Sequence, residues 1–306
     1  MVYAGWLGSH PATILLKYAW QWVQTSRILR RERPRTVFVM SPPVLAALPA
    51  FLYAWRHGAH VVLDAHTCAF VLRRWRWLQG LQRWCCRRAR TTLVTNRHIA
   101  QLVEAAGGHA TLVPDVPVQF PEQGVFPRSS RFTVAVVCSF TEDEPTAEIF
   151  AAARLLPDLD IFLSGDPAPL AASLRTRLPP NVTLTGFLDT AAYGGLIRGA
   201  DVVVDLTTED HTMLRGAYEA IYQGVPVIVS DWPLLRQAFP MGAVHVANTA
   251  DAIAAAVGTV MADHRRFREA AAQLRRAKLA SWDVTRQAIH AHLTPPIDAS
   301  LVSETP

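Results

Sequence analysis

The chain has 306 residues, which predicts roughly two domains, and half of the residues are hydrophobic, which is enough for a core in each. Residues 1–100 hold 15 Lys and Arg but two acids, whereas residues 101–306 hold 15 basic and 23 acidic residues. This asymmetry predicts that the first third of the chain faces an anionic partner, such as membrane lipid, a phosphorylated acceptor or nucleic acid. Nucleic acid is the least favoured of these, because the sequence contains no recognisable nucleic-acid-binding module.

The spacing of the cysteines and the length of the apolar runs exclude further classes of protein. The four cysteines have neither metal-binding nor redox spacing, which favours a reduced, cytosolic setting. The opening residues lack the basic and apolar pattern of a secretory signal peptide. The longest apolar run, residues 44–55, contains Pro49 and is shorter than the roughly 20 residues that span a bilayer. We therefore expect a protein without transmembrane helices.

In chain order, strands alternate with helices through residues 1–116. The expected strands lie at residues 37–40, 61–63, 92–95 and 111–113. The expected helices lie at residues 14–29, 44–56, 70–90 and 99–106. Asp64 and His66 follow the second strand, and Asp115 follows the last one, where we interpret it as shaping a hinge. This alternation predicts a parallel sheet covered by helices.

Residues 70–90 are predicted to form one long basic helix that contains Trp75, Trp77 and Trp84. Tryptophan at the depth of lipid headgroups, with arginine paired to phosphates, is typical of a helix at a membrane surface. The alternative is a surface helix whose tryptophans pack on the sheet. The first interpretation predicts a cytoplasmic protein bound peripherally to the anionic inner face of the cell membrane.

Residues 117–131 contain three prolines and show no periodicity, so we interpret them as an interdomain linker. Strands and helices alternate again over residues 132–293. The expected strands lie at residues 132–138, 160–163, 182–184, 200–206, 225–229 and 244–246. Two separate helices are expected at residues 264–279 and 282–293. Residues 294–306 are interpreted as a flexible tail.

Residues 205–232 are the most informative stretch. A strand end is followed by the polar loop Thr207–Thr212, a helix whose apolar positions begin at Met213, and a buried strand. Ligands of such a unit bind at the carboxyl end of the strand and at the helix N-terminus. The loop therefore predicts an anion site, and Glu219 lies in the same unit.

The two Rossmann-like halves, the Gly-Phe pair that ends in Phe187 and the sequence from Glu219 to Asp231 together resemble the GT-B glycosyltransferases. The similarity is greatest to the family-4 type, which uses nucleotide sugars and usually retains anomeric configuration, and it is strongest over residues 181–232. The resemblance implies an α/β fold with two doubly wound parallel-sheet domains that face a cleft. Residues 1–116 would lie on the acceptor side, and residues 132–293 would bind the nucleotide sugar.

The resemblance assigns a role to Glu219. In such enzymes the second Glu of a motif with seven residues between two glutamates binds the ribose hydroxyls of the donor, and Glu219 matches that position. His211 stands where the first Glu, which faces the donor sugar, would be. A different contact from His211, or substitution by Glu209 or Asp210, is left open.

Other donor-binding residues follow from the same resemblance. The loop that begins at Ser139 lacks the Lys or Arg that usually holds the diphosphate. Diphosphate binding would then rely on Arg215, the Thr212 hydroxyl and the N–H groups of a helix start near Met213. Thr207 and Phe187, at two strand ends, complete the expected donor site. The acids at residues 142–144 are interpreted as capping the next helix.

His66 follows a strand of the first domain, as does the histidine that meets the donor sugar in similar enzymes, and Asp64 is expected to orient it or to act as an acid or base. Related chains open with a hydrophobic strand and a Gly-rich loop. This sequence begins at what matches the second strand, so we expect either that the true start lies upstream of Met1 or that the first strand of the sheet is missing.

The implied function is a retaining glycosyltransferase that moves a sugar from a nucleoside diphosphate to a glycan or lipid-linked acceptor, without a metal or other cofactor. Two alternatives remain. His211 and the missing strand would also suit a non-catalytic protein that binds nucleotide sugars or acts as a scaffold. A GT-B-type sugar-nucleotide epimerase would release its product without an acceptor.

Overall fold

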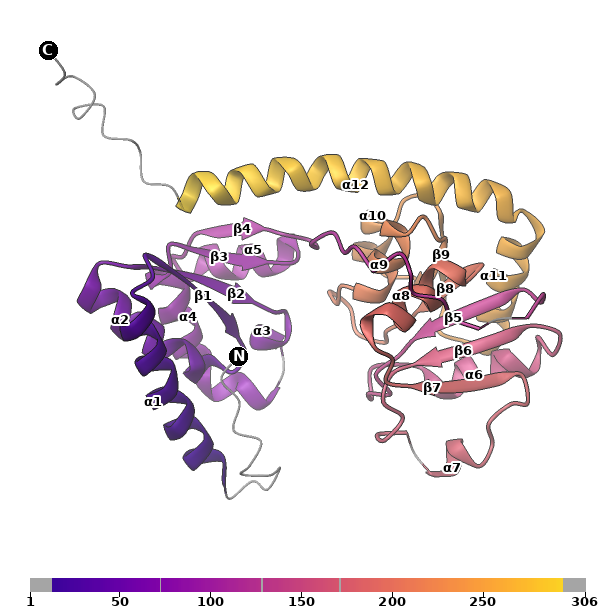
Figure 1. Cartoon of the computed structure of the whole chain (residues 1–306), viewed down its shortest axis with the longest axis horizontal. Coiled ribbons are helices and arrows are strands. Elements are labelled where there is room, and N and C mark those ends of the chain that lie inside the picture. The colour runs from indigo at the N-terminus through magenta and orange to yellow at the C-terminus, as the bar shows by residue number, and fades with distance from the viewer. Residues whose placement is uncertain (1–12, 72, 128, 171, 294–306) are drawn as a thin grey trace, which may run out of the picture. The chain divides into compact units, whose positions relative to one another are not determined.

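A computed structural model describes residues 13–71, 73–127, 129–170 and 172–293. The chain forms two compact units, and the division falls between Pro114 and Asp115 and again between Trp282 and Asp283 (Figure 1). The unit that contains the residues before Asp115 is called unit 1, and Asp115–Trp282 is called unit 2. The predicted tail, residues 294–306, lies outside the described residues.

Unit 1 is built on a four-stranded parallel sheet in the order β1-β2-β3-β4. Its strands are β1 (Thr36–Ser41), β2 (His60–Ala65), β3 (Thr91–Val94) and β4 (Ala110–Leu112). Each overlaps one of the four strands expected in this part of the sequence, so these strand predictions are confirmed to within one or two residues at the ends. Within the described residues β1 is an edge strand, and its Phe38 and Met40 are exposed.

The helices of unit 1 cover one face of this sheet with a single core. They are α1 (Ile14–Glu32), the 3-10 turn η3 (Val44–Ala47), α2 (Leu48–His57), α3 (Cys68–Val71), the 3-10 turn η4 (Arg73–Leu78), α4 (Gln79–Arg88) and α5 (Arg97–Ala105). The prediction of one helix over residues 70–90 is wrong, because the segment divides into α3, η4 and α4. The Gln79 side chain donates to the backbone oxygen of Ala69 at 2.8 Å, a bond that folds the segment back on itself.

Unit 2 is built on a six-stranded parallel sheet in the order β10-β9-β8-β5-β6-β7. Its strands are β5 (Thr133–Val137), β6 (Asp160–Ser164), β7 (Val182–Gly186), β8 (Val202–Asp205), β9 (Val227–Ser230) and β10 (Ala243–Val246). In the centre, Val134 of β5 pairs with Ile161 of β6 on one side and with Val202 of β8 on the other. The strand order reverses between β5 and β8, which is where ligands of open α/β sheets bind.

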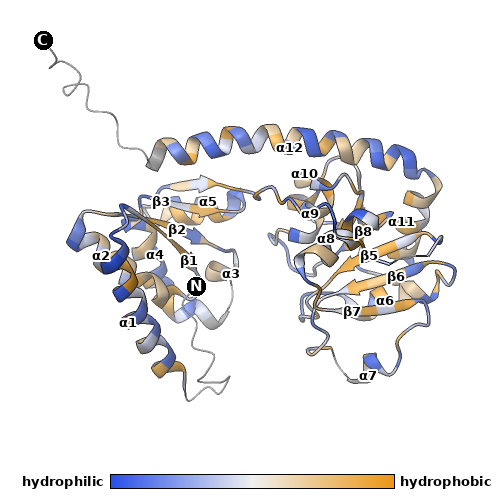
Figure 2. Ribbon diagram, in the orientation of Figure 1, coloured by the Kyte–Doolittle hydropathy of each residue, from blue (hydrophilic) through white to orange (hydrophobic). Residues whose placement is uncertain are grey.

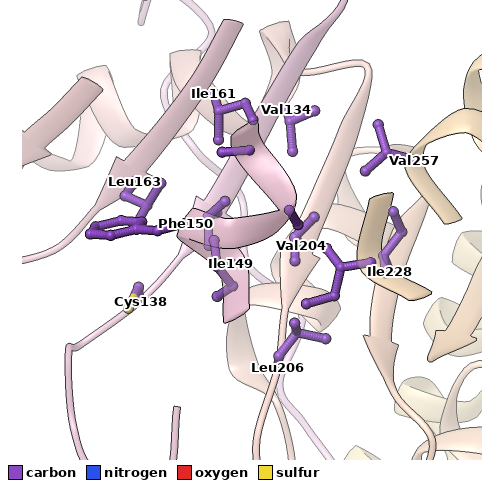
Figure 3. Close-up of a cluster of buried hydrophobic side chains, with 14 of the residues drawn as sticks. Val134, Cys138, Ile149, Phe150, Ile161, Leu163, Val204, Leu206, Ile228 and Val257 are labelled. Atoms are coloured by element: carbon purple, nitrogen blue, oxygen red, sulfur yellow. The ribbon is translucent and has the colours of Figure 1, made fainter. Parts of the chain in front are cut away.

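Helices cover both faces of the unit 2 sheet. They are α6 (Thr146–Arg154), α7 (Ala172–Arg175), α8 (Thr190–Gly199), α9 (Arg215–Tyr222), α10 (Pro233–Ala238), α11 (Ala250–Ala262) and the part of α12 (His264–Leu293) that precedes Asp283, the residue from which α12 belongs to unit 1. One face packs on α6 and α11 (Figure 3), and the other packs on α8, α9, α10 and the first part of α12. Figure 2 shows strands β5 and β6 as largely hydrophobic, which fits burial on both faces.

Two predictions for unit 2 need correction. Helix α12 is one continuous helix and not two, because residues 280–281, where the break was expected, are Ala and Ser and contain no Gly or Pro. The described residues of the expected linker, 117–127 and 129–131, form no helix or strand, and the segment is part of unit 2 and packs on the rest of it. The Phe120 ring meets the Tyr193 ring edge-on at 5.5 Å, and Arg198 donates to the oxygens of Pro121 and Gly124 at 2.7 and 2.9 Å.

Candidate functional site

The loops that follow β5 and β8 lie together at the point where the strand order reverses. The backbone N–H of Thr208 donates to the backbone oxygen of Asp143 at 2.7 Å, and the Thr208 hydroxyl donates to the same oxygen at 3.1 Å. These bonds join the loop after β8 to the loop after β5. The carboxyl ends of the central strands of unit 2 therefore carry one continuous polar region.

Asp205, the last residue of β8, is buried and caps helix α9. Its Oδ2 accepts from the backbone N–H of Ala217 at 2.8 Å, in the first turn of the helix. Burial raises the pKa of Asp205 to about 7, and the charges of Glu144 and Glu219 act in the same direction. Helix α9 begins at Arg215 and not near Met213, and part of its N-terminal hydrogen-bonding capacity is already used by the protein's own carboxylate.

Glu219 lies in α9 and is buried, with a different donor on each carboxylate oxygen. Its Oε1 accepts from the Arg215 Nε at 2.9 Å, one helical turn earlier, and its Oε2 accepts from the Tyr193 hydroxyl of α8 at 2.7 Å. Burial and the Glu219 charge raise the pKa of Tyr193, so the tyrosine keeps its proton as a donor. The Arg215 side chain is 71 % exposed, which leaves a cation at the mouth of the site.

Ser139 belongs to a backbone nest that surrounds the Glu144 carboxylate. The Ser139 N–H donates to both Glu144 oxygens, at 2.9 and 2.8 Å, and the Thr141 N–H donates to Oε2 at 3.3 Å. The Cys138 thiol lies 3.0 Å from the same Oε2 and donates to it, and burial followed by the Glu144 charge raises the thiol's pKa. Glu144 thus binds the loop before α6, and the interpretation that residues 142–144 cap that helix is wrong for this residue.

Thr207 is held by the surrounding backbone and side chains. Its backbone N–H donates to the Ser230 hydroxyl at 2.9 Å, and its backbone oxygen accepts from Trp232 Nε1 at 3.1 Å and from Asn248 Nδ2 at 2.9 Å. Its hydroxyl accepts from the Glu209 N–H at 3.1 Å. These contacts fix the strand end and the loop, and the partners from β9 and from the loop after β10 have no local signal in the sequence.

The remaining donor-site candidates lie around this polar region. His211 has a left-handed backbone (φ 62°), and its N–H donates to the Asp210 carboxylate at 2.7 Å while its Nε2 lies 3.5 Å from the second oxygen. Thr212 is half-buried, and Met213 packs against the core beside α9. Phe187 follows β7 with its ring 88 % exposed.

Asp115 interacts electrostatically with groups of helix α9, which its interpretation as part of a hinge does not predict. Its buried Oδ2 has no hydrogen-bond partner among the described residues, and burial raises the pKa of Asp115 to about 6. Its charge also acts on Tyr218 and Tyr222 of α9. The Lys278 ammonium lies 4.3 Å from the centre of the Tyr218 ring, and burial lowers the pKa of Lys278 to about 8.

Asp64 and His66 lie at and just after the carboxyl end of β2, in unit 1. Asp64 is half-buried, His66 is exposed, and the His66 backbone N–H donates to the Ser41 backbone oxygen at 2.9 Å. All the donor-site candidates above belong to unit 2. Among the described residues there is no group of three or more His, Cys, Asp or Glu side chains arranged to bind a metal ion.

Comparisons with known proteins agree with this architecture. Residues 144–291 match a family model described as glycosyl transferase-like. Sucrose-phosphate synthase from Thermosynechococcus elongatus has a similar structure, with a TM-score of 0.69 and 15 % identity over 92 % of this chain and 81 % of that one. Anabaena HepE in complex with UDP-glucose gives a TM-score of 0.65 and 15 % identity over 89 % of this chain and 81 % of that one.

A structure described as a putative UDP-N-acetylglucosamine 2-epimerase from Listeria monocytogenes is also similar, with a TM-score of 0.56 and 13 % identity over 84 % of this chain and 73 % of that one. No curated protein matches the chain by sequence. At these identities the structural matches establish the fold alone. The chain therefore has the GT-B fold, and its residues 144–291 are similar to glycosyl transferase-like proteins.

Proposed function

We propose that the chain is a glycosyltransferase that moves a sugar from a nucleoside diphosphate sugar to a glycan or lipid-linked acceptor, with retention of configuration. The observation that carries the proposal is the state of Glu219 in the region that is similar to glycosyl transferase-like proteins. Its carboxylate is buried and held by two donors, Arg215 and Tyr193. A carboxylate has about four acceptor positions, so a fixed Glu219 can still accept both ribose hydroxyls of a nucleotide.

The proposed roles of the other groups follow from their charge and exposure. Arg215 stabilises the negative charge that develops on the leaving diphosphate, which is usually the largest single contribution to catalysis. His66 contacts the sugar near the anomeric carbon, and Asp64 orients that histidine. His211 faces the donor sugar, Ser139 and Thr212 bind phosphate oxygens, and Phe187 offers an exposed ring to the base. The proposal includes no metal and no other cofactor.

The acceptor side of the proposal rests on unit 1. Trp55 and Trp77 are 78 % and 81 % exposed, and an apolar cavity of about 800 Å³ is lined by Trp22, Trp55 and Trp84 with Arg88 at its wall. Exposed tryptophan beside arginine is typical of proteins that rest on anionic membranes. None of the described helices has the length and apolarity needed to cross a bilayer. We therefore propose a lipid-linked acceptor and a peripheral position on the inner face of the cell membrane.

The test compares Glu219→Ala with the matched variant Glu269→Ala, which removes an exposed acid from α12. Both proteins would be screened for stabilisation by a panel of nucleotide sugars and then assayed for sugar transfer. Loss of donor stabilisation and of turnover in Glu219→Ala alone is expected. Turnover at the wild-type rate in Glu219→Ala would remove the assignment of the donor site.

One observation favours a second function. The side chain at the position of the sugar-facing glutamate is His211, which is turned toward Asp210 in a left-handed turn. A protein that binds nucleotide sugars without transferring them would have this property. Calorimetry that shows donor binding, with no transfer and no hydrolysis on prolonged incubation with wild-type protein, would support it. Conversion of the donor to its epimer without any acceptor would instead support an epimerase.

A further inference from the structure

The nest after β5 is an anion-binding arrangement that already holds an anion of the protein itself. Two backbone N–H groups and one thiol point at the Glu144 carboxylate, with donor–acceptor distances from 2.8 to 3.3 Å. Backbone N–H groups that converge in this way bind phosphate as readily as carboxylate, because both are oxyanions. The nest thus has the chemistry of a phosphate site, with Glu144 in the place of the phosphate.

The local sequence explains why the nest forms. Phe140 adopts a left-handed backbone (φ 56°) and buries its ring in the core between the sheet and α6, so the chain reverses after Ser139. The Glu144 N–H donates to the Thr141 backbone oxygen at 3.1 Å and closes the turn. Gly165, after β6, has no side chain to collide with the Cys138 backbone oxygen, which lets the neighbouring loop approach. The carboxylate of Glu144 is thereby returned to the strand end.

The nest lies where ligands of the unit 2 sheet are expected to bind. It follows β5, the strand at which the sheet order reverses, and its loop is bonded to the loop after β8. Residues 138–146 contain three acids and no Lys or Arg, so no cation of this loop would balance a second anion. Asp205 is close enough for the Glu144 charge to raise its pKa. A diphosphate that enters here meets the Glu144 carboxylate, which already occupies the nest, and the carboxylate of Asp205.

We propose that Glu144 is an internal competitor of the donor diphosphate, so that its carboxylate must leave the N–H groups of Ser139 and Thr141 before a phosphate of the donor can bind them. The inference rests on the proposed function, because it takes the ligand of unit 2 to be a nucleoside diphosphate. Under this proposal Glu144 limits donor affinity. It thereby favours ligands whose other parts, such as the ribose at Glu219, contribute enough binding energy to displace it.

The experiment measures three ligands on four forms of the full chain by calorimetry. The ligands are inorganic pyrophosphate, UDP and uridine, which lacks phosphate. The proteins are wild type, Glu144→Gln, Glu144→Ala and the matched control Glu142→Gln, which removes one exposed acid from the same loop. Glutamine retains an oxygen that accepts from Ser139, so Glu144→Gln separates loss of charge from loss of the loop's shape. Melting temperatures of all four proteins report on folding.

Both Glu144 variants should bind pyrophosphate and UDP roughly tenfold more tightly than wild type, as expected when one charge-assisted hydrogen bond no longer competes. Uridine affinity should stay the same in all forms, and Glu142→Gln should match wild type throughout. In Glu144→Gln labelled with nitrogen-15, the amide resonances of Ser139 and Thr141 should shift when pyrophosphate is added.

Pyrophosphate affinity that is equal to or weaker than that of Glu142→Gln in both Glu144 variants would overturn the inference, as would no measurable pyrophosphate binding to either variant. In that case Glu144 only shapes the loop. The proposed function fails separately. If no form binds UDP or any nucleotide sugar but the Glu144 variants still gain pyrophosphate affinity, the nest is an anion site of another ligand. If UDP binding depends on Glu219 but not on Glu144, the proposed function is supported, and the inference that Glu144 competes with the diphosphate is overturned.

Discussion

The carboxyl ends of the strands differ between the two units. In unit 2, Asp205, Glu219 and Glu144 each accept hydrogen bonds from fixed donors, and the first two are buried. In unit 1, Asp64 is half-buried and His66 is exposed. Burying carboxylates costs free energy unless donors stabilise them, and fixed donors leave little freedom of movement. The carboxylates of unit 2 are therefore held by the protein's own donors, whereas Asp64 and His66 are more accessible to solvent.

The largest expected effect tests that difference through stability. Asp205→Ala removes the carboxylate that caps α9, so the free energy of unfolding should fall by about 3 kcal/mol, the cost of a lost cap together with buried N–H groups left without a partner. Asp64→Ala, at the corresponding strand end of unit 1, should cost less than about 1 kcal/mol. Urea denaturation of both variants measures this. Equal losses would remove the contrast between the units.

The next effect concerns turnover. His66→Ala should lower kcat about 100-fold if the imidazole acts at the reacting centre, a typical contribution of a positioned acid or base. The affinity for UDP should not change, because His66 is proposed to contact the sugar and not the nucleotide. His98→Ala, an exposed histidine on α5, is the control. A drop in donor affinity with unchanged kcat would move His66 from the reacting centre to donor binding.

The pH dependence of the free energy of unfolding tests the burial of carboxyl groups in unit 2. The pKa values of Asp205 and Asp115 are raised from 3.8 to about 7 and about 6, so the folded protein holds protons that the unfolded chain has released. The free energy of unfolding should therefore fall as pH rises from about 4 to about 7, by up to about 1.4 kcal/mol per pH unit for each proton, and then level off.

Asp205→Asn keeps an oxygen for the Ala217 N–H but cannot titrate, so its decline with pH should be shallower than that of wild type. Denaturation curves at pH 4 to 8 give both slopes. Identical slopes would show that the burial of Asp205 does not govern its ionisation.

The smallest effect concerns the support of Glu219. Tyr193→Phe removes one of the two donors to its carboxylate, so donor affinity should fall about fivefold, which corresponds to roughly 1 kcal/mol for one hydrogen bond. Tyr222→Phe, in a second buried tyrosine of unit 2, should leave affinity unchanged. Calorimetric titration with a nucleotide sugar distinguishes the two. An equal loss in both variants would mean that packing, and not the bond to Glu219, is affected.

The sequence predicted the strands well, because nearly every strand is a short apolar run followed by a polar residue. Val225–Val229, for example, reads as a buried strand, and β9 occupies Val227–Ser230. The prediction that Glu219 binds the donor rests on its position in a motif and stays a prediction. No motif indicates its hydrogen-bond partner Tyr193, because 26 residues separate the two and only the packing of α8 beside α9 brings them together.

Other features depended on backbone geometry that residue patterns do not carry. The role of Glu144 follows from the left-handed turn at Phe140, a conformation that the residue type does not indicate. The break of residues 70–90 is accompanied by a side-chain bond from Gln79 to the backbone of Ala69, two residues far apart along the segment. Asp115 was interpreted as part of a hinge because its neighbours are prolines and strand ends, and the charges that surround it come from distant helices.

The packing of residues 117–131 on α8 also bears on how this protein can be divided or recombined. A side chain at position 194 would collide with the Phe120 side chain, so the close packing of this segment requires Gly194. Arg198 binds the same segment. A fragment that began at the first strand of unit 2 would uncover Tyr193, the residue that supports Glu219. Exchange of this half between related chains would preserve its interior only if the junction fell at Asp115, before the segment and not after it.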